Sequence, residues 1–286
     1  MTNAEKKQLA VAACKVRIGV IEATHGAKCG HPGGSLSAAD VFTYLYFKEM
    51  RIDPKNPKWD DRDRFVLSKG HTAPGLYATL ANRGFFPVSD LPTLRHSDSY
   101  LQGHPNMNLV PGVDMSTGSL GQGVSAAAGM AKAAKHLGKD NVRVYTLLGD
   151  GEIAEGECWE SFLFSAHYKL DNLCVIVDVN GLQIDGPTKQ VMNTDPLDEK
   201  LKAFGFNVVV VNGNDFDELE RAFDVFHNTQ GMPTAILMRT TKGLGVSYML
   251  GSIDWHGKAP NDAEYEIAMT ELRAQLAQAE EEARHE

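Results

Sequence analysis

The sequence predicts an α/β fold in which a parallel sheet is covered by helices on both faces. Short runs rich in Val, Ile and Leu alternate with helical patterns in the second half of the chain, as in βαβ units. The segments between these runs are long enough for right-handed crossover connections. With 286 residues, 43% hydrophobic and 23% charged, the chain is large enough to bury the core of such a domain.

The first half is predicted to be mainly helical, because apolar residues recur there at three- and four-residue spacing. The helices are expected over about residues 4–24 and 36–48, from the SKGHTAP loop to about Arg83, and from Ser119 to about His136. A short strand is expected at Arg64–Leu67. Residues 86–117 contain several Pro and Gly and are expected to be loops.

The second half is more regular, with apolar strands separated by helices. The strands are expected at Arg143–Leu148, Leu173–Val179, Asn207–Val211 and Thr234–Arg239, and the helices at about 157–167, 197–204 and 215–228, with a loop over 180–197. Residues 261–286 carry eight Asp or Glu and two Arg, which favours a solvated terminal helix. We therefore expect one domain over residues 1–260 and an acidic helix or tail over 261–286.

Composition narrows the class of protein. The net charge of −9 argues against a nucleic-acid partner, and the four cysteines show no paired or zinc-type spacing. The N-terminus resembles an amphipathic helix rather than a signal peptide, and no stretch approaches the ~20 apolar residues of a membrane span. A reduced, cytoplasmic protein with no membrane partner is expected.

Two polar residues follow neighbouring strands of the predicted sheet. Asp150, in Gly-Asp-Gly, follows one strand, and Asn180 follows the next, thirty residues on. If these strands pair, the residues meet at the carboxyl edge of the sheet, where α/β proteins bind ligands. A carboxylate, an amide oxygen and a loop carbonyl form a hard oxygen site for Mg²⁺, or Ca²⁺ in its place. The plainer interpretation is a turn at Gly-Asp-Gly and a cap at Asn180.

The GDG sequence with Asn about thirty residues later resembles the signature of thiamine-diphosphate enzymes. The resemblance implies that the side chains of Asp150 and Asn180 and the carbonyl of Leu182 hold the metal that bridges the diphosphate. It also implies that the N–H of Gly151 approaches a phosphate, because glycine has no Cβ in the way.

Histidines in Gly-rich loops make the resemblance more specific. CGHPGG, DRDRFVLSKGH, STGSLGQG, LQGHPN and WHGKAP resemble SGHPG, DRDRFVLSNGH, TTGPLGQG, PGHPE and HGAPLG of transketolases. The matches occur in family order from about residue 5 to 260. The chain thus resembles the thiamine-diphosphate-binding (PP-type) domain of transketolase, although Asn106 replaces the Glu of GHPE and HPGGS replaces HPGAP.

The resemblance implies a role for each matching residue. The catalytic residues would be His31, His104 and His256, and the substrate contacts would be His31, Arg95 and His104. The cofactor contacts would be His71, Gly118, Leu120, Asp150, Gly151, Glu155, Asn180, Ile184 and His256. Without the family, Arg95 would be interpreted as a surface ion pair and Glu155 as an ordinary acidic residue at a helix start.

In transketolases, the glutamate that activates the cofactor belongs to a pyrimidine-binding domain for which this sequence has no counterpart. The resemblance therefore implies one subunit of a two-chain transketolase of the pentose phosphate pathway, which moves a two-carbon ketol unit from a ketose phosphate to an aldose phosphate. A partner subunit would carry the pyrimidine-binding domain, in a heterotetramer around a homodimer core.

Several alternatives remain open. A ketolase for a sulfosugar or branched sugar could use the same residues, and half of another thiamine enzyme, such as a 2-oxo acid dehydrogenase, would share the metal signature. A non-catalytic partner subunit with the same fold is a further alternative. GQGVSA also fits the dinucleotide pattern GxGxxA, but no strand precedes it, so we reject that interpretation.

Overall fold

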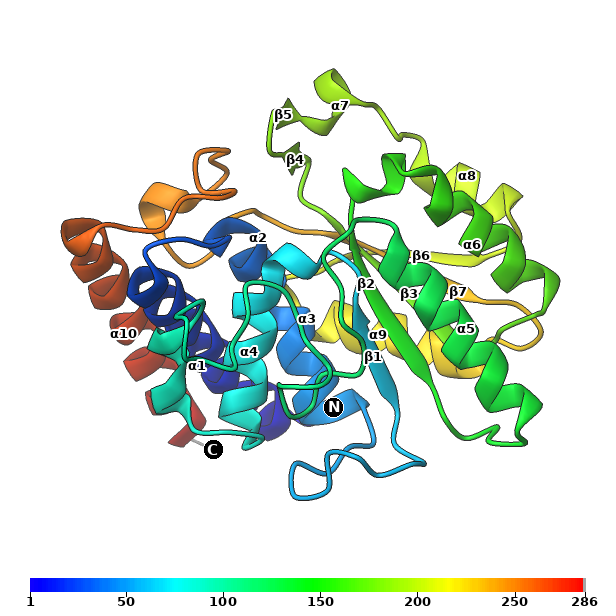
Figure 1. Cartoon of the computed structure of the whole chain (residues 1–286), viewed down its shortest axis with the longest axis horizontal. Coiled ribbons are helices and arrows are strands. Elements are labelled where there is room, and N and C mark those ends of the chain that lie inside the picture. The colour runs from blue at the N-terminus through cyan, green and yellow to red at the C-terminus, as the bar shows by residue number, and fades with distance from the viewer. Residues whose placement is uncertain (285–286) are drawn as a thin grey trace.

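Five parallel strands form the central sheet, in the order β1-β2-β3-β7-β6 (Figure 1). The strands are β1 Arg64–Leu67, β2 Val144–Gly149, β3 Leu173–Val179, β6 Asn207–Asn212 and β7 Thr234–Arg239. This computed structural model describes residues 1–284. The three central strands are almost wholly buried, as expected for a parallel sheet with helices on both faces.

One face of the sheet packs against α1 Asn3–Ala27, α3 Ala39–Tyr44, α4 Ala73–Arg83 and α9 Phe216–Asn228. Alternate strand residues such as Phe65, Tyr145 and Ile176 point into this larger core. The short α2 Pro32–Ser37 continues the layer near the strand ends. On the same side, α10 Asp262–Arg284 packs along α1 and buries Ala268, Met269 and Leu272.

The other face packs against α5 Gln122–His136, α6 Gly156–His167 and α8 Leu197–Ala203. The intervening strand residues, including Val66, Leu148 and Val175, form this second core. The first turn of α5 lies close to the end of β1: a Cβ on Gly123 would stand 2.6 Å from Cα of Ser68. The small residues of this helix therefore allow the close approach that the sequence suggests.

All five predicted strands are confirmed to within a residue at either end, and together they form the sheet. The predicted helix at 36–48 is divided into α2, α3 and a π-helical turn at Leu45–Glu49. The prediction that Ser119 opens a helix is wrong, because α5 begins at Gln122. Gly121 before it has φ +82°, a left-handed conformation that cannot belong to a right-handed helix.

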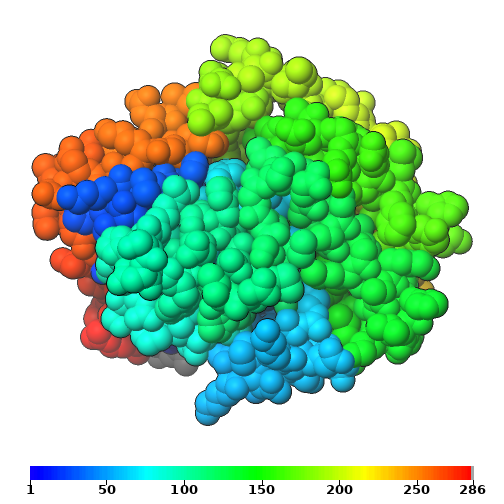
Figure 2. Space-filling model, viewed as in Figure 1, coloured from blue at the N-terminus to red at the C-terminus, as the bar shows by residue number. Residues whose placement is uncertain are grey.

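The stretch 180–197, expected to be a loop, holds a two-stranded antiparallel hairpin and a short helix. These are β4 Leu182–Gln183, β5 Gly186–Pro187 and α7 Thr188–Val191. Among residues 1–284, no helix combines the length and the apolar composition needed to cross a bilayer. At the upper edge of the molecule, the hairpin, the loop near residue 255 and the segment near residue 31 lie next to one another (Figures 1 and 2).

Candidate active site

The predicted metal ligands lie at the carboxyl ends of two neighbouring strands. β2 and β3 pair in parallel with Gly149 opposite Asp178, so the residues that follow them come together. Asp150 is buried, and its two carboxylate oxygens accept hydrogen bonds from the N–H groups of Gly181, at 2.7 Å, and Gly151, at 2.9 Å. The carboxylate thus joins the end of β2 to the turn that carries Asn180.

Asn180 and Leu182 complete this arrangement. The side-chain oxygen of Asn180 accepts a hydrogen bond from the N–H of Leu182 at 3.1 Å. The carbonyl of Leu182 accepts one from Nζ of Lys242, also at 3.1 Å. A carboxylate, an amide oxygen and a backbone carbonyl are therefore held on one hydrogen-bonded unit, which is the oxygen set that a hard divalent cation takes.

Burial and the neighbouring carboxylate of Asp178 raise the pKa of Asp150 to about 6, although the two N–H donors act against this. A cation bound nearby would stabilise the ionised form of this buried carboxylate. The described residues contain no group of three or more His, Cys, Asp or Glu that could hold a metal ion. The site therefore offers Asp150 as a single carboxylate ligand and depends on neutral oxygens for the rest.

Three of the four predicted histidines form a cluster beside this unit. The ring centroids of His31 and His71 are 5.1 Å apart, those of His71 and His256 are 5.3 Å apart, and those of His31 and His256 are 5.6 Å apart. Each comes from a different segment of the chain, and His71 lies in a short 3-10 helix, Gly70–Thr72. The Nδ1 atom of His31 is buried and has no partner among the described residues, which leaves it available to a bound molecule.

The histidines of the cluster are neutral near pH 7. Burial and then the charge of Lys242 lower the pKa of His256 to about 3. Burial and then Arg95 lower the pKa of His31 to about 4. Burial, followed by the charge of Lys69, holds the pKa of His71 well below its usual value. Neutral imidazoles can both donate and accept hydrogen bonds, as substrate hydroxyls require.

His104 and Arg95 lie next to the segment that carries Gly118. Gly118 has φ +153°, and a Cβ there would lie 3.1 Å from Cγ of His104. Arg95 packs across Gly103 and donates a hydrogen bond to its carbonyl at 3.4 Å. Burial and the charge of Arg95 lower the pKa of His104. Two glycines thus leave room for the predicted substrate-contacting side chains.

One of the remaining predicted residues, Gly151, belongs to this centre, because its N–H donates a hydrogen bond to Asp150. Gly151 packs against Gln183, whose side-chain nitrogen is buried and has no partner in the described chain. Leu120 and Ile184 are exposed apolar residues. Glu155 precedes α6 and lies beside Gly121. A Cβ on Gly121 would stand 2.9 Å from Cβ of Glu155.

Two lysines of the site, Lys69 and Lys242, were not predicted from the sequence. Each side chain is buried, with only 2% exposed. Nζ of Lys69 lies 2.5 Å from the carboxylate of Asp178, and Nζ of Lys242 lies 2.7 Å from Nδ1 of His256. Burial and then the charge of Lys69 lower the pKa of Lys242 to about 8. Lys69 stands where the similar motif SNGH has Asn, a signal that could have identified it; Lys242 has no comparable signal.

These observations fit an anionic ligand bound together with a divalent cation. Lys242 supplies positive charge, the partnerless atoms of His31 and Gln183 require hydrogen-bond partners, and glycine at 118 and 151 leaves the backbone accessible. A polar cavity of about 400 Å³ opens beside the predicted metal ligands and is lined by Asp150, Asn180, Lys189 and Arg239 among others.

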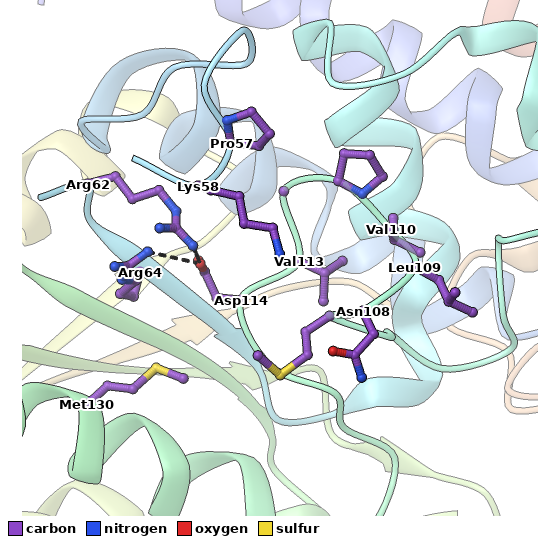
Figure 3. Close-up of a pocket in the computed structure, with 13 residues that line it drawn as sticks. Pro57, Lys58, Arg62, Arg64, Asn108, Leu109, Val110, Val113, Asp114 and Met130 are labelled. Carbon is purple, nitrogen blue, oxygen red and sulfur yellow. Dashed lines mark hydrogen bonds and ion pairs between the residues drawn. The ribbon is translucent and has the colours of Figure 1, made fainter. Parts of the chain in front are cut away.

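A second pocket, of about 430 Å³, contains none of the predicted site residues (Figure 3). It lies beside the first residue of β1, where Arg62 and Arg64 both pair with Asp114. Burial raises the pKa of Asp114 to about 6, against the opposing effect of Arg62. The carboxylate also accepts a hydrogen bond from the N–H of Phe65, so this cluster anchors the loop before α5 to the sheet.

Residues 7–280 match the family described as "Transketolase, thiamine diphosphate binding domain". The chain is 44% identical over 248 residues to a 6-deoxy-6-sulfo-D-fructose transketolase subunit of Clostridium sp. (strain MSTE9), covering 87% of this chain and 90% of that one. It is 42% identical over 268 residues to an apulose-4-phosphate transketolase subunit of Phocaeicola vulgatus, covering 94% of this chain and 95% of that one.

Longer relatives match over part of their length. Human transketolase is 43% identical, covering 85% of this chain and 38% of that protein. A transketolase of Pichia stipitis solved with sedoheptulose 7-phosphate is 30% identical, with a TM-score of 0.88, covering 99% of this chain and 44% of that one. The chain thus spans less than half the length of these longer transketolases.

Proposed function

Because this chain belongs to the family of the transketolase thiamine-diphosphate-binding domain, we propose that it is the diphosphate- and metal-binding subunit of a two-chain transketolase. The assembled enzyme transfers a two-carbon ketol unit from a ketose phosphate to an aldose phosphate. The observation that carries this proposal is the meeting of the hydrogen-bonded unit of Asp150, Asn180 and Leu182 with the cluster of His31, His71 and His256.

The family's cofactor is thiamine diphosphate, with a divalent metal such as Mg²⁺ or Ca²⁺. In this chain, Asp150, Asn180 and the carbonyl of Leu182 would hold the metal. The diphosphate contacts would be His71, His256, the backbone at Gly118 and Gly151, and the buried Lys242. Leu120 and Ile184, both exposed, would pack against the ring that follows. When bound, the cofactor supplies the carbon that carries the ketol unit between the two sugars.

The protein's own groups bind, orient and move protons. His31 and His104 hydrogen-bond the sugar hydroxyls and exchange protons with them, because their lowered pKa keeps a free nitrogen lone pair near neutral pH. His256 donates a hydrogen bond to the oxygen on which negative charge develops. Arg95, next to His104, adds a positive charge for an anionic part of the substrate.

The partner is a second polypeptide that supplies the pyrimidine-binding domain. Support comes from relatives of similar length that are named as subunits, and from the much greater length of human transketolase. Glu155, exposed at the start of α6, would then link paired sites across a homodimer core within a heterotetramer. A role in the cytoplasmic pentose phosphate pathway follows from this proposal.

A second candidate substrate class is a branched or sulfonated sugar. Relatives named for apulose 4-phosphate and for 6-deoxy-6-sulfofructose favour it. Asn106, which replaces the family's Glu near the substrate, accepts a hydrogen bond from the N–H of Asn108 and so stabilises its own turn. This leaves the neighbourhood of His104 without the family's carboxylate, so a sugar bound there would meet an amide in its place.

The test is co-expression with the cognate C-terminal chain, followed by calorimetry and a substrate screen. We expect thiamine diphosphate to bind with Mg²⁺, and ketol transfer only when both chains are present. Full activity of this chain alone would rule out the need for a partner. Absence of cofactor binding, even with the partner, would favour a non-catalytic subunit. Preference for a sulfosugar or branched sugar would identify the second substrate class.

A further inference from the structure

A fully buried carboxylate lies at the centre of the candidate site and takes no direct part in the proposed chemistry. Asp178 is the penultimate residue of β3 and is 0% exposed. Four side chains donate hydrogen bonds to it: Ser37 at 2.6 Å, Lys69 at 2.5 Å, Asn180 at 3.0 Å and Thr240. These donors come from α2, the end of β1, the end of β3 and the end of β7, so one carboxylate connects four segments.

We propose that Asp178 is a positioning residue that fixes the orientation of the Asn180 side-chain amide. An ionised carboxylate can only accept hydrogen bonds, so it holds the NH₂ end of Asn180. The oxygen of the same amide must then point away, toward the side where it meets the N–H of Leu182. This is the oxygen that a divalent cation would use, and the inference therefore rests on the metal site proposed above.

The surroundings of Asp178 keep this orientation rigid. Its backbone is fixed on both sides, because it pairs with Gly149 of β2 and with Met238 of β7. The cost of burying its charge is offset by Lys69, which is itself 2% exposed. The hydroxyl groups of Ser37 and Thr240 occupy further lone pairs, so the carboxylate has no freedom to turn from Asn180.

Lys69, the ion-pair partner of Asp178, distinguishes this chain from the similar transketolase motif. The similar transketolase motif SNGH has Asn where this sequence has Lys, and here the ammonium group lies 2.5 Å from Asp178. Removing Asp178 alone would leave that ammonium buried without a counter-charge, which destabilises a fold strongly. An informative variant must therefore change both residues together.

The double variant Lys69→Met/Asp178→Leu removes the acceptor and both charges. The probe is Mn²⁺, titrated with paramagnetic detection into the complex of this chain, its partner and thiamine diphosphate. Because outer contacts of metal ligands typically contribute 10–100-fold to affinity, we expect Mn²⁺ binding to weaken at least about tenfold. Thr240→Val is the matched control: it removes another hydrogen bond to Asp178 but spares Asn180, and should change affinity less than about threefold.

Unchanged Mn²⁺ affinity in the double variant would overturn the positioning role. If instead the wild-type complex binds no Mn²⁺, the proposed metal site itself is wrong. A measurement on the metal-free wild-type chain is independent of the variants' folding: hydrogen exchange of the Asn180 side-chain amide, identified by its absence in Asn180→Ser. We expect it to be slower than that of the exposed Asn56, and equally fast exchange would contradict the proposal.

Discussion

The N–H of Gly181 donates a 2.7 Å hydrogen bond to the carboxylate of Asp150, across 31 residues of sequence. This bond joins the ends of β2 and β3 directly at the carboxyl edge of the sheet. The carboxylate therefore holds the turn that carries Asn180 against the end of β2. Because the same carboxylate is the proposed metal ligand, a change at Asp150 should weaken metal binding.

Asp150→Asn should weaken Mg²⁺ binding at least about tenfold, because the amide has no charge and only one accepting oxygen for two N–H donors. Calorimetry with thiamine diphosphate and the partner chain measures this. The control is Asp185→Asn, since Asp185 is an exposed carboxylate in the nearby hairpin between β4 and β5. Equal losses in both variants would show a general charge effect rather than a metal ligand.

The histidine cluster predicts a pH dependence of stability. The folded-state pKa is about 3 for His256 and about 4 for His31, mainly because of burial, whereas unfolded histidine titrates near about 6.5. As pH falls below that value, the unfolded chain binds protons that the folded chain does not, so the free energy of unfolding decreases.

His256→Gln should therefore lose less stability than the wild type between about pH 7.5 and 5. Urea denaturation of this subunit at the two pH values measures the difference. His136→Gln, at an exposed position in the last turn of α5, serves as control and should follow the wild type. A loss in the His256 variant as large as in wild type would contradict the prediction.

Gly118→Ala should lower ketol transfer by the assembled enzyme at least about tenfold, because the new Cβ would press on His104 and misplaced catalytic groups are costly. Gly84→Ala is the matched control: Gly84 also has a positive φ, of +96°, but nothing lies within 4 Å of its Cβ position. It should cost stability of about 1 kcal/mol and leave activity intact. The comparison separates backbone strain from displacement of His104.

Lys242→Met should weaken thiamine-diphosphate binding about tenfold or more, because it removes a buried positive charge beside His256. Calorimetry at two salt concentrations measures the change. Lys242→Arg should recover little of the lost affinity, because the guanidinium group is larger than an ammonium group and planar. Lys58→Met, at an exposed position, is the control for net charge. If both Met variants weaken binding equally, the effect is long-range and the assignment of Lys242 is wrong.

Replacing two glycines of α5 by alanine, one at a time, should change the stability of the fold in opposite directions. Gly123→Ala should destabilise the fold by about 2 kcal/mol, because its Cβ would lie 2.6 Å from backbone of Ser68. Gly129→Ala, in the same helix with nothing within 4 Å, should stabilise it by about 0.5–1 kcal/mol. Chemical denaturation of both variants checks the signs, and a matching sign would refute this account of α5 packing.

Much of the sheet could be predicted from the sequence because its strands are continuous apolar runs. The runs at Leu173–Val179 and Thr234–Arg239 are buried from end to end or nearly so. The hairpin at 182–187 could not be predicted, because each strand has only two residues and carries no periodicity. The start of α5 was misplaced because a left-handed Gly121 interrupts an otherwise helical composition.

The meeting of Asp150 and Asn180 could be predicted from the strand ends, since parallel neighbours bring both residues to one edge. The carbonyl of Leu182 was implied only by the family resemblance. The histidine cluster did not: no spacing relates His31, His71 and His256, and only the family resemblance grouped them. Lys242 and Asp178 were missed because a lone lysine or a strand aspartate usually faces solvent. Their burial depends on tertiary contacts that local patterns do not encode.

The three clustered histidines are separated by up to 225 residues of chain, although their rings lie within 5.6 Å of one another. During translation at about 5–20 residues per second, His31 leaves the ribosome roughly 10 to 45 s before His256. The histidine cluster is therefore incomplete until residue 256 has been synthesised. A ligand that needs all three rings could not guide the folding of the segments made before that point.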